Sequence, residues 1–376
     1  MARRGHGEGS IYQRKDGRWA ATISLDGGKR KTFYGKTRKE VQEQLKIALH
    51  EQQQGTLATG PKQTVKAYLE HWMEDVHKPN IRLSSYRRYG VFLNKHILPA
   101  IGHIQLQKLT AQQVQAFYAR KLKEGLSVSM VRGMHGLLHK ALDQAVRWKI
   151  ISVNVCDAVS VPSAPRHEMR TLSKEQAQKL LEAAKGHRLE ALLTVALATG
   201  MRKGELLALR WEDVNLEEMS LQVKRTIVGQ FNGEYRENEP KTASGRRNIL
   251  LPQFAIDALK QHRIRQLEAR LQAGEAWVDR GLVFCNSNGD FFPLTTLYDS
   301  FQALLKQAEL PRIRFHDLRH SAATILLSMG VPAKVIQELL GHSQISVTLN
   351  TYSHVLPSMQ QEAMQRMNDV FRERSR

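Results

Sequence analysis

Short stretches in which apolar and polar residues alternate occupy the beginning of the chain. Three of them have the length and the aromatic or β-branched content of strands: Ser10–Tyr12, Trp19–Ile23 and Lys31–Tyr34. Turn signals separate them at Lys15–Gly17 and Asp26–Gly28. Thr37 then has the character of a cap before a helix from Lys39, whose apolar positions share one face. The pattern predicts a small three-stranded sheet packed against one helix.

From Thr64 to Ala158 the apolar positions recur every three or four residues, which is the period of a helix packed on one side. The stripes include several aromatic residues: Tyr68, Trp72, Tyr86, Tyr89, Phe92, Phe117 and Tyr118. We interpret these rings as core and not as base-stacking groups. Linkers containing glycine or proline bound this helical region, at Gln52–Gln63 and at 161–166.

The chain is again mainly helical from Arg170 onward, with one β excursion. Ser173 and Gln176 form a capping-box pattern at the first helix. Ser220–Val223 and Arg247–Pro252 are typical of strands, and we expect them to be the outer strands of a small antiparallel sheet. After Pro357, apolar residues again follow helical spacing: Ala363, Met364, Met367, Val370 and Phe371. The apolar face of this tail helix is expected to pack either on its own domain or on a neighbouring protomer.

Together the patterns predict a mainly helical, multidomain α+β protein. The expected domains are 1–55, the sheet-and-helix module; 62–160, a helical domain; and 168–376, a mixed, mainly helical domain that ends in the tail helix.

The charge of the chain gives information about its binding partner. Lys and Arg total 56 against 36 Asp and Glu, which gives a formal net charge of +20. A folded chain this basic is expected to bind a polyanion. Nucleic acid is favoured over a membrane, because the positive charge is spread along the chain and no lipid-facing stretch accompanies it. The alternative is a protein that its own charge keeps in solution.

The two cysteines, Cys156 and Cys285, are too few for a disulfide framework or a zinc site and fit a reducing cytosol. The N-terminus has charge but no apolar segment behind it, so no signal peptide is expected. We expect a protein of the bacterial cytosol, associated with the nucleoid, with no membrane partner.

Two segments combine cations with helix ends or hairpins. An apolar helix stops at Gly200 and Arg202 opens the next one, with Glu205 at i+3 to brace the guanidinium. A planar fork held in this way suits two oxygens of a phosphate. Lys241 lies in a polar hairpin from which a lysine can swing into a site as a proton donor. Taken alone, the first is ordinarily a surface ion pair and the second a solvated loop.

Two further segments add histidine, arginine and tyrosine. His316 and Arg319 stand one helical turn apart on a helix that apolar residues anchor in the core. Gly341 ends a helix begun at Pro332, and His342 projects from the break. A short final helix, capped by Ser346, carries Tyr352. Each such residue alone is more often part of a core than of a catalytic site, so the combination and its order carry the argument.

The motif HDLRHSAAT followed by LLGHSQISVTLNTYSH resembles the tyrosine recombinase family, in particular phage-type integrases. The resemblance covers essentially the whole chain. It implies a catalytic domain from Thr171 to Val355, a SAM-like core-binding domain before it, and an AP2-like arm-binding module at the start. Six active residues and a supporting carboxylate carry over: Arg202, Lys241, His316, Arg319, His342 and Tyr352, with Glu205 in support. Gly245 departs from the pattern, since serine is common there, and this puts the flexibility of the lysine loop in question.

The phosphate chemistry can be reasoned out for these groups. Arg202 and Arg319 would clamp the equatorial oxygens of a five-coordinate phosphorus, and His342 would add a hydrogen bond. Two guanidiniums supply the charge that magnesium brings to other phosphoryl-transfer sites, so we expect no metal cofactor. The bond energy would stay in a protein–DNA link, so we expect no ATP, in keeping with the lack of a P-loop signature.

The proton transfers complete the expected mechanism. Tyr352 would attack the phosphate, and a phenol with an ordinary pKa of about 10 needs a base. His316 is the candidate base and Lys241 the candidate acid for the departing 5′ oxygen. The product would be a 3′-phosphotyrosyl link and a free 5′ hydroxyl.

The resemblance implies double-stranded DNA with core and arm attachment sites as the partner, and a homotetramer that exchanges strands through a Holliday junction to integrate or excise a phage or mobile element. It leaves room for a host DNA-bending protein and an excision factor. The basic residues that we expect to contact DNA are Arg14, Lys15, Arg18, Lys29, Arg30, Lys31, Arg87 and Arg88; Arg120, Lys121 and Lys123 are further exposed candidates.

Two other functions stay open at this point. A type IB topoisomerase shares the chemistry, but it has no need of an arm-like module that binds a second DNA site. A DNA-binding regulator would keep the fold without the chemistry, but it has no need of the complete set of six residues.

Overall fold

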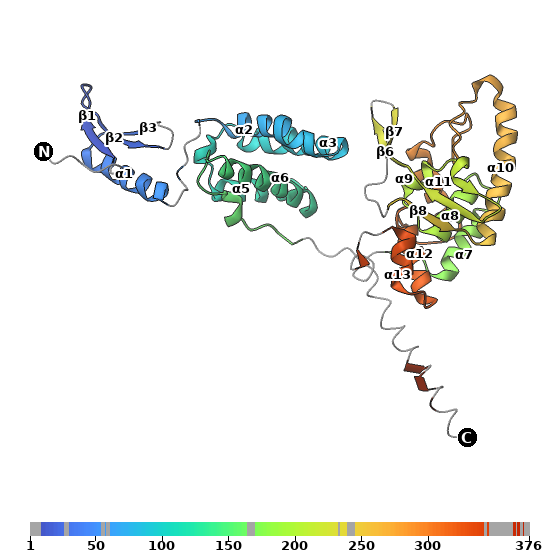
Figure 1. Ribbon diagram of the computed structural model, residues 1–376. Helices are drawn as coiled ribbons and strands as arrows, with labels where there is room; N and C mark the ends of the chain where they lie inside the picture. Colours follow the sequence, from blue (N-terminus) through green and yellow to red (C-terminus); the bar gives the residue numbers. More distant parts are fainter. Residues whose placement is uncertain are drawn as a thin grey trace. The chain divides into compact units, whose positions relative to one another are not determined.

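The computed structural model describes residues 9–25, 30–53, 57, 61–163, 170–231, 234–238, 245–341, 344–345, 364–365, 367–368 and 371. It divides into two compact units, Met1–Arg166 and His167–Arg376. We describe each unit by itself (Figure 1). The expected mainly helical fold with small antiparallel sheets is confirmed. The three-way division into domains stays a prediction.

The N-terminal module is a three-stranded antiparallel sheet in the order β1-β2-β3, followed by one helix. The elements are β1 Ser10–Gln13, β2 Trp19–Ser24, β3 Arg30–Gly35 and α1 Arg38–Gln53. Thr37 Oγ1 accepts a hydrogen bond from the Glu40 amide at 3.2 Å, as expected of a cap. Ala21 and Ile23 of the sheet are buried in one cluster with Val41 and Leu45 of α1. The predicted sheet and helix are therefore present, although α1 extends through Gln53 into the expected linker.

The other face of this sheet carries no helix of the module. Ala20 pairs with Tyr12 on one side and with Tyr34 on the other, so the two rings lie in one cross-strand row. Tyr12 is 47% exposed and Tyr34 is 49% exposed. Side chains alternate between the faces of a strand, so Arg30 belongs to this open face and Lys31 to the face that α1 covers. Two half-exposed aromatic rings therefore lie together on the open face of the sheet.

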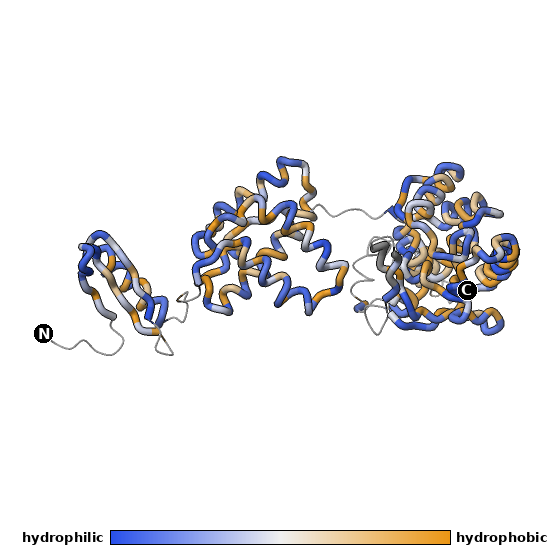
Figure 2. The backbone as a smooth tube through the Cα atoms, turned by 90° about the horizontal axis from the view of Figure 1, so that it is seen from above, coloured by the Kyte–Doolittle hydropathy of each residue, from blue (hydrophilic) through white to orange (hydrophobic). Residues whose placement is uncertain are grey.

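A helical domain follows in the same unit. Its α-helices are α2 Val65–His71, α3 Leu83–Val91, α4 Leu98–Ile101, α5 Ala111–Lys123 and α6 Val128–Arg147; π-helical segments Trp72–His77 and Phe92–Ile97 continue α2 and α3; and 3₁₀ turns lie at Lys78–Asn80, Leu106–Lys108 and Val155–Ala158. The tube in Figure 2 alternates between apolar and polar along these helices. Tyr68, Trp72 and Phe117 are almost fully buried, as expected of core residues.

Two of the basic residues expected to be exposed on this domain are not. Arg87 is only half exposed, whereas Arg88 is exposed. The Lys121 side chain is 12% exposed and forms an ion pair with Glu124 at 2.7 Å. The spacing of apolar residues predicts which side of a helix is buried, but it does not show that residues at the border of that side, such as Arg87 and Lys121, are partly covered.

The second unit is built around α8, most of whose residues are buried. Its helices are α7 Lys174–Ala183, α8 Glu190–Thr199, α9 Lys203–Leu207, α10 Gln253–Ala273, α11 Leu294–Gln307, α12 Asp317–Ser328 and α13 Ala333–Leu340, with 3₁₀ turns at Trp211–Asp213 and Gly274–Ala276. Helix α8 contacts both α10 and α12. The expected capping box of Ser173 and Gln176 begins α7. Because α8 is closely packed on several sides, the turn at its end, at Gly200, is held in a fixed position.

The β excursion of this unit differs from the expectation. A three-stranded sheet has the order β4-β5-β8, and a separate hairpin pairs β6 with β7. The bounds are β4 Val214–Asn215, β5 Ser220–Val223, β6 Thr226–Phe231, β7 Glu234–Asn238 and β8 Arg247–Leu250. The expectation that Ser220–Val223 is an outer strand was wrong: the two-residue strand β4 takes the outer place, and β5 lies in the middle. Three of the four β5 residues are buried, which fits a central strand.

Candidate active site

The turn between α8 and α9 forms the base of the candidate site. Gly200 ends α8 with φ +61°, in the left-handed region that favours glycine. A Cβ there would come within 2.5 Å of Leu340 Cδ2 in α13. Three segments that are far apart in sequence therefore meet at a residue without a side chain: the end of α8, helix α13 and helix α12, whose Arg319 bonds the Gly200 carbonyl.

Arg202 lies just beyond this turn, as the N-cap of α9. Its Nη1 atom donates to Glu205 Oε1 at 2.8 Å, and Glu205 Oε2 accepts from the Arg202 amide at 3.0 Å. The side chain of Arg202 is 40% exposed, whereas that of Glu205 is 3% exposed. The buried carboxylate thus holds an accessible guanidinium in one orientation.

Glu205 also binds a second guanidinium that sequence reasoning did not single out. Arg247 Nη2 donates to Glu205 Oε2 at 2.9 Å. Burial raises the pKa of Glu205, but Arg247 and then Arg202 outweigh that effect, so the pKa lies below its ordinary value. The signal for Arg247 was present in the alternation of β8. Arg247 is two residues before the buried Ile249 and so points to the same, inner face.

Arg319 brings the second predicted guanidinium to the same turn. It is 3% exposed, in the first turns of α12, and its Nη1 atom donates to the Gly200 carbonyl at 2.8 Å. The start of α12 is itself held in place. Ser321 Oγ donates to the Asp317 carbonyl and accepts from the Leu172 amide, both at 2.9 Å. Arg319 is therefore a fixed charge below the surface of the site.

His316 is the N-cap of α12 and remains exposed at one edge. Partial burial of the ring lowers its pKa, and the charges of Arg319, Arg314 and Arg202 lower it further, against the opposite effect of Asp317. The guanidiniums of Arg319 and Arg202 therefore both lie within electrostatic range of the His316 ring. A lowered pKa keeps the imidazole neutral near pH 7, when it can accept a proton.

The end of α13 closes the candidate site. Gly341 ends that helix in the left-handed conformation, with φ +67°, as expected, and Pro332 is its N-cap. Arg202 Nη2 donates to the Gly341 carbonyl at 3.1 Å. Arg202 is therefore in contact with Gly341, the residue immediately before His342 in the sequence.

The β6–β7 hairpin packs against the helix that Arg202 begins. A Cβ on Gly204 would lie 2.4 Å from the Ile227 carbonyl oxygen and 2.6 Å from Thr226 Oγ1, so only glycine permits this approach. Arg210 forms an ion pair with Glu237 of β7 at 3.0 Å and holds the second strand as well. The hairpin that precedes Lys241 in sequence is thus anchored beside α9.

The structure therefore brings together three of the six predicted catalytic residues: Arg202, His316 and Arg319, with Glu205 behind them. Lys241, His342 and Tyr352 lie outside the described residues, as do the cap Ser346 and the predicted final helix. In the predicted tail helix, Met364, Met367 and Phe371 are exposed, and Ala363 and Val370 lie outside the described residues.

A cationic pocket beside α12 was also missed from the sequence. Its volume is about 280 Å³, and its lining includes Arg170, Arg312, Arg314 and Tyr298, with one carboxylate, Asp317, which pairs with Arg314 at 2.8 Å. The three arginines are exposed. Ile313, which lies between Arg312 and Arg314 in the sequence, is buried. This exposed–buried–exposed alternation before His316 was the available signal for two outward-pointing cations.

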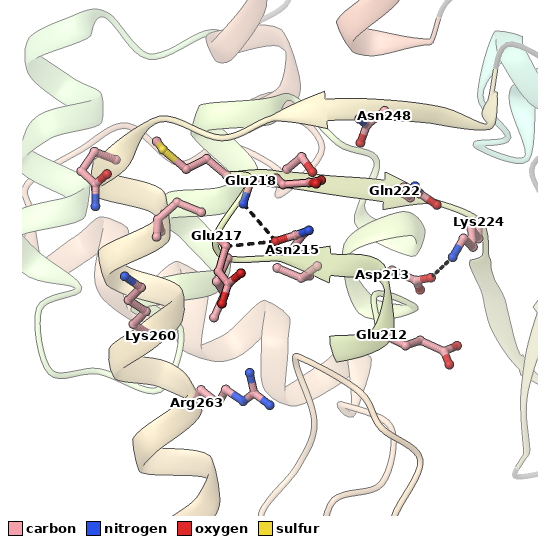
Figure 3. Close-up of a pocket in the computed structure, with 16 residues that line it drawn as sticks. Glu212, Asp213, Asn215, Glu217, Glu218, Gln222, Lys224, Asn248, Lys260 and Arg263 are labelled. Carbon is pink, nitrogen blue, oxygen red and sulfur yellow. Dashed lines mark hydrogen bonds and ion pairs between the residues drawn. The ribbon is translucent and has the colours of Figure 1, made fainter.

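A second, larger groove among the described residues has a different character. It measures about 950 Å³, and Figure 3 shows Asn215, Gln222 and Asn248 on the sheet side, with Lys260 and Arg263 from α10. Four carboxylates line it: Glu212, Asp213, Glu217 and Glu218. Asp213 is paired with Lys224 at 2.9 Å. None of the described catalytic candidates lines this groove, and its carboxylates disfavour a phosphate ligand.

The predicted DNA contacts of the N-terminal module have unequal positions. Arg14, Lys15, Arg18 and Arg30 are exposed, whereas Lys29 lies outside the described residues. Arg14 lies over the Tyr34 ring, 5.2 Å from its centre. Arg18 pairs with Asp16 at 2.7 Å. Lys31 lies 5.4 Å from the Phe33 ring centre, and burial lowers its pKa. Arg14 and Arg30 thus lie at the open face, whereas Lys31 lies on the face that α1 covers.

The described part of the chain has neither a metal-binding cluster nor a membrane-spanning helix. Among those residues, no group of three or more His, Cys, Asp or Glu side chains is arranged to hold a metal ion. Among the same residues, no helix is both long enough and apolar enough to cross a bilayer. Cys156 and Cys285 are both free thiols.

Comparison with known families matches two parts of the chain. Residues 170–359 match the phage integrase family, and residues 64–122 match the phage integrase N-terminal SAM-like domain. A tyrosine recombinase XerC-like protein of Caldanaerobacter subterraneus is 33% identical over 94% of this chain and 96% of its own length. An integrase of Streptomyces ambofaciens is 30% identical over 98% of both chains.

Solved structures share the fold. The Tn1549 transposon integrase in complex with transposon right end DNA has a TM-score of 0.70 and 21% identity, over 81% of this chain and all of that one. A lambda integrase tetramer bound to a Holliday junction has a TM-score of 0.56 and 17% identity, over 89% of this chain and 96% of that one. The family expected from the HDLRHSAAT and LLGHSQ motifs is confirmed: the chain belongs to the phage integrase family and is a tyrosine recombinase.

Proposed function

We propose that this recombinase breaks and rejoins DNA at specific sites through a covalent link between Tyr352 and a 3′ phosphate. One observation carries the proposal. Arg202 and Arg319, which lie 117 positions apart by their numbers, meet at the same glycine turn beside His316. Two guanidiniums and a neutral imidazole around one point form a suitable receptor for a phosphodiester.

The two arginines have different tasks in this proposal. Arg319 is buried and fixed by the Gly200 carbonyl, so it supplies a charge that does not reorganise during the reaction. Arg202 is accessible and supplies the fork that meets the non-bridging oxygens. Because these charges stabilise the five-coordinate phosphorus, we propose that the chemistry needs neither a metal ion nor ATP.

The proton transfers follow from the same positions. His316 has a lowered pKa and an exposed edge, which suits a base that accepts the proton of the Tyr352 phenol. The phenolate oxygen then bonds to phosphorus, and the bond from phosphorus to the 5′ oxygen breaks. Lys241 donates the proton that the departing 5′ oxygen takes up, and His342, next to the anchored Gly341, donates a hydrogen bond to the phosphate. Attack by the 5′ hydroxyl of a partner strand reverses these steps and completes the exchange.

Other surfaces of the chain suit the remainder of a DNA substrate. The open face of the N-terminal sheet, with Tyr12, Tyr34 and Arg30, is proposed to bind arm sites. The pocket lined by Arg312 and Arg314 is proposed to hold a phosphate next to the scissile one. We further propose a homotetramer on core and arm sites, located in the bacterial cytosol, with a host DNA-bending protein and an excision factor as helpers.

The proposal is tested by covalent trapping on a nicked DNA duplex that carries a candidate core site. Wild type is expected to form a protein–DNA adduct resistant to denaturation, and Tyr352→Phe to form none. Tyr89→Phe, in the helical domain, is the matched control and should form the adduct normally. Adduct formation by Tyr352→Phe, or its absence with wild type, contradicts the proposal. Supercoil relaxation without any two-site product would instead identify a topoisomerase.

The tail is proposed to dock on a neighbouring protomer. Met364, Met367 and Phe371 are 58%, 52% and 61% exposed, so these apolar side chains are available to a partner. Deletion of the residues after Pro357 is expected to weaken tetramer assembly on DNA, measured by analytical ultracentrifugation of the complex. Unchanged assembly would show that the tail serves its own domain.

A further inference from the structure

Arg247 joins three segments around the candidate site. It is the first residue of β8, next after the described part of the lysine loop, and its side chain is 8% exposed. Its Nε atom donates to the Leu339 carbonyl at 2.6 Å, Nη1 to the Gly245 carbonyl at 3.2 Å and Nη2 to Glu205 at 2.9 Å. One guanidinium thus links α13, the lysine loop and α9.

A charge count gives this link a chemical meaning. Glu205 carries one negative charge and is 3% exposed, so water screens it little. With Arg202 as its only partner, the buried pair would have no net charge. With Arg247 as well, two guanidiniums and one carboxylate leave a net charge of +1. Arg247 therefore compensates Glu205, and the charge of Arg202 remains available to a ligand.

The geometry of Glu205 supports the same division of labour. Oε1 binds the Arg202 guanidinium at 2.8 Å, and Oε2 binds Arg247 at 2.9 Å. The carboxylate is held from both ends, so its first oxygen keeps a fixed direction behind Arg202. Arg247 also ties the last turn of α13, through Leu339, to the same carboxylate. Arg247 thereby fixes the position of Arg202 relative to the end of α13.

We propose that Arg247 is a positioning residue for phosphate cleavage: it neutralises Glu205 and fixes it, so that Arg202 presents a net positive charge to the scissile phosphate. Arg247 itself stays buried behind the site and does not touch the substrate. This inference rests on the proposed function, because it assigns Arg202 to the phosphate.

The first test compares single-turnover cleavage by wild type, Arg247→Met and Arg247→Lys on the nicked duplex. Arg247→Met is expected to lose about 100-fold in cleavage rate, the size found for loss of one transition-state donor. Arg247→Lys keeps the charge but not the three directed bonds, and should lie between the two. Arg265→Met is the control, since Arg265 also pairs with a carboxylate, that of Glu190, at the end of α8 opposite Gly200.

Two further measurements separate this role from a merely structural one. A methylphosphonate at the scissile position removes one negative charge, so the deficit of Arg247→Met should shrink to about 10-fold or less if charge is what Arg247 supplies. Adding Glu205→Gln to Arg247→Met restores the net charge of +1 and should recover part of the rate, a non-additive result. A structural role predicts equal deficits on both substrates and a double variant slower than either single one.

The outcomes distinguish the inference from the proposed function. No adduct with wild type overturns both. Normal adduct formation by wild type with full activity in Arg247→Met, or with an equal loss on phosphodiester and methylphosphonate, overturns the role of Arg247 alone. If Arg247→Met does not fold, by its thermal unfolding curve, the neutral Arg247→Gln and Arg247→Gln with Glu205→Gln take its place, with the same substrate comparison.

Discussion

The open face of the N-terminal sheet and the turn at Gly200 both present cations to DNA in our proposal, but in opposite ways. On the sheet, Arg14 and Arg30 are exposed, and Arg14 has an aromatic ring beneath it. At the turn, Arg319 is buried and Arg202 is braced by a buried carboxylate. Exposed cations reorient and are screened by salt, whereas buried ones keep a direction. The first arrangement suits affinity and the second suits catalysis.

The largest effect is expected from Arg319→Lys, which keeps the charge at the turn but loses the planar fork. The cleavage rate should fall by about 10²–10³-fold, while DNA affinity changes little, because the lost bonds act on the transition state. Single-turnover trapping and a binding titration check this. Arg270→Lys, on α10, whose side chain is 52% exposed, is the control and should cleave normally. Equal losses in both variants would remove the contrast between buried and exposed cations.

Gly200→Ala tests the turn itself. The new Cβ would face a positive φ and a contact of 2.5 Å with Leu340, so the free energy of unfolding should fall by about 2–4 kcal/mol. Gly186→Ala is matched, because Gly186 also has a positive φ of +72° but no atom within 4 Å of the added Cβ. Its expected loss is about 1 kcal/mol. Denaturant unfolding measures both, and similar losses would mean that close packing at Gly200 does not matter.

A smaller effect is expected for pH. Protonation of His316 removes the base, and its pKa is lowered, so the imidazole stays neutral to a lower pH than an ordinary histidine. The acid-side fall in cleavage rate should therefore lie below pH 6.5, the ordinary value. His316→Gln should cleave slowly and lose this fall, whereas His103→Gln, at an exposed position, should keep it. A fall centred above pH 6.5 would contradict the environment described for His316.

The smallest effect on chemistry is expected from the N-terminal module. Replacing Arg14, Arg18 and Arg30 by alanine should leave core-site cleavage unchanged and lower the slope of log affinity against log salt by up to about 3 on arm DNA. Replacement of Arg38, Lys39 and Lys46 on α1 removes the same charge from the other side of the module. If both triple variants change the slope equally, net charge and not the open face binds the DNA.

The sequence predicted the structure correctly where it depends on local features, such as the spacing of apolar residues or a residue that caps a helix. The sheet and helix at the start, the box at Ser173 and the left-handed end at Gly341 followed from local patterns. The middle position of β5 did not, because strand order depends on long-range pairing that alternation does not encode.

At the site, the motif spacing identified Arg202, His316 and Arg319 as candidates, and the structure adds how they are held. The carbonyl that fixes Arg319 and the carbonyl at Gly341 that meets Arg202 are backbone atoms, which carry no residue-type signal. Arg247 was overlooked because it lies in a basic loop sequence, where a cation is ordinarily solvated. Only its inward register in β8 distinguishes it from Arg246.

The hydroxyl of Ser321 has a mechanical consequence. It links the backbone of Leu172, close to where the chain enters the second unit, with the first turn of α12, 149 positions later. The position of Leu172 and the orientation of the helix that carries Arg319 are therefore tied together through this one group, so Ser321 couples the start of the second unit to the candidate site.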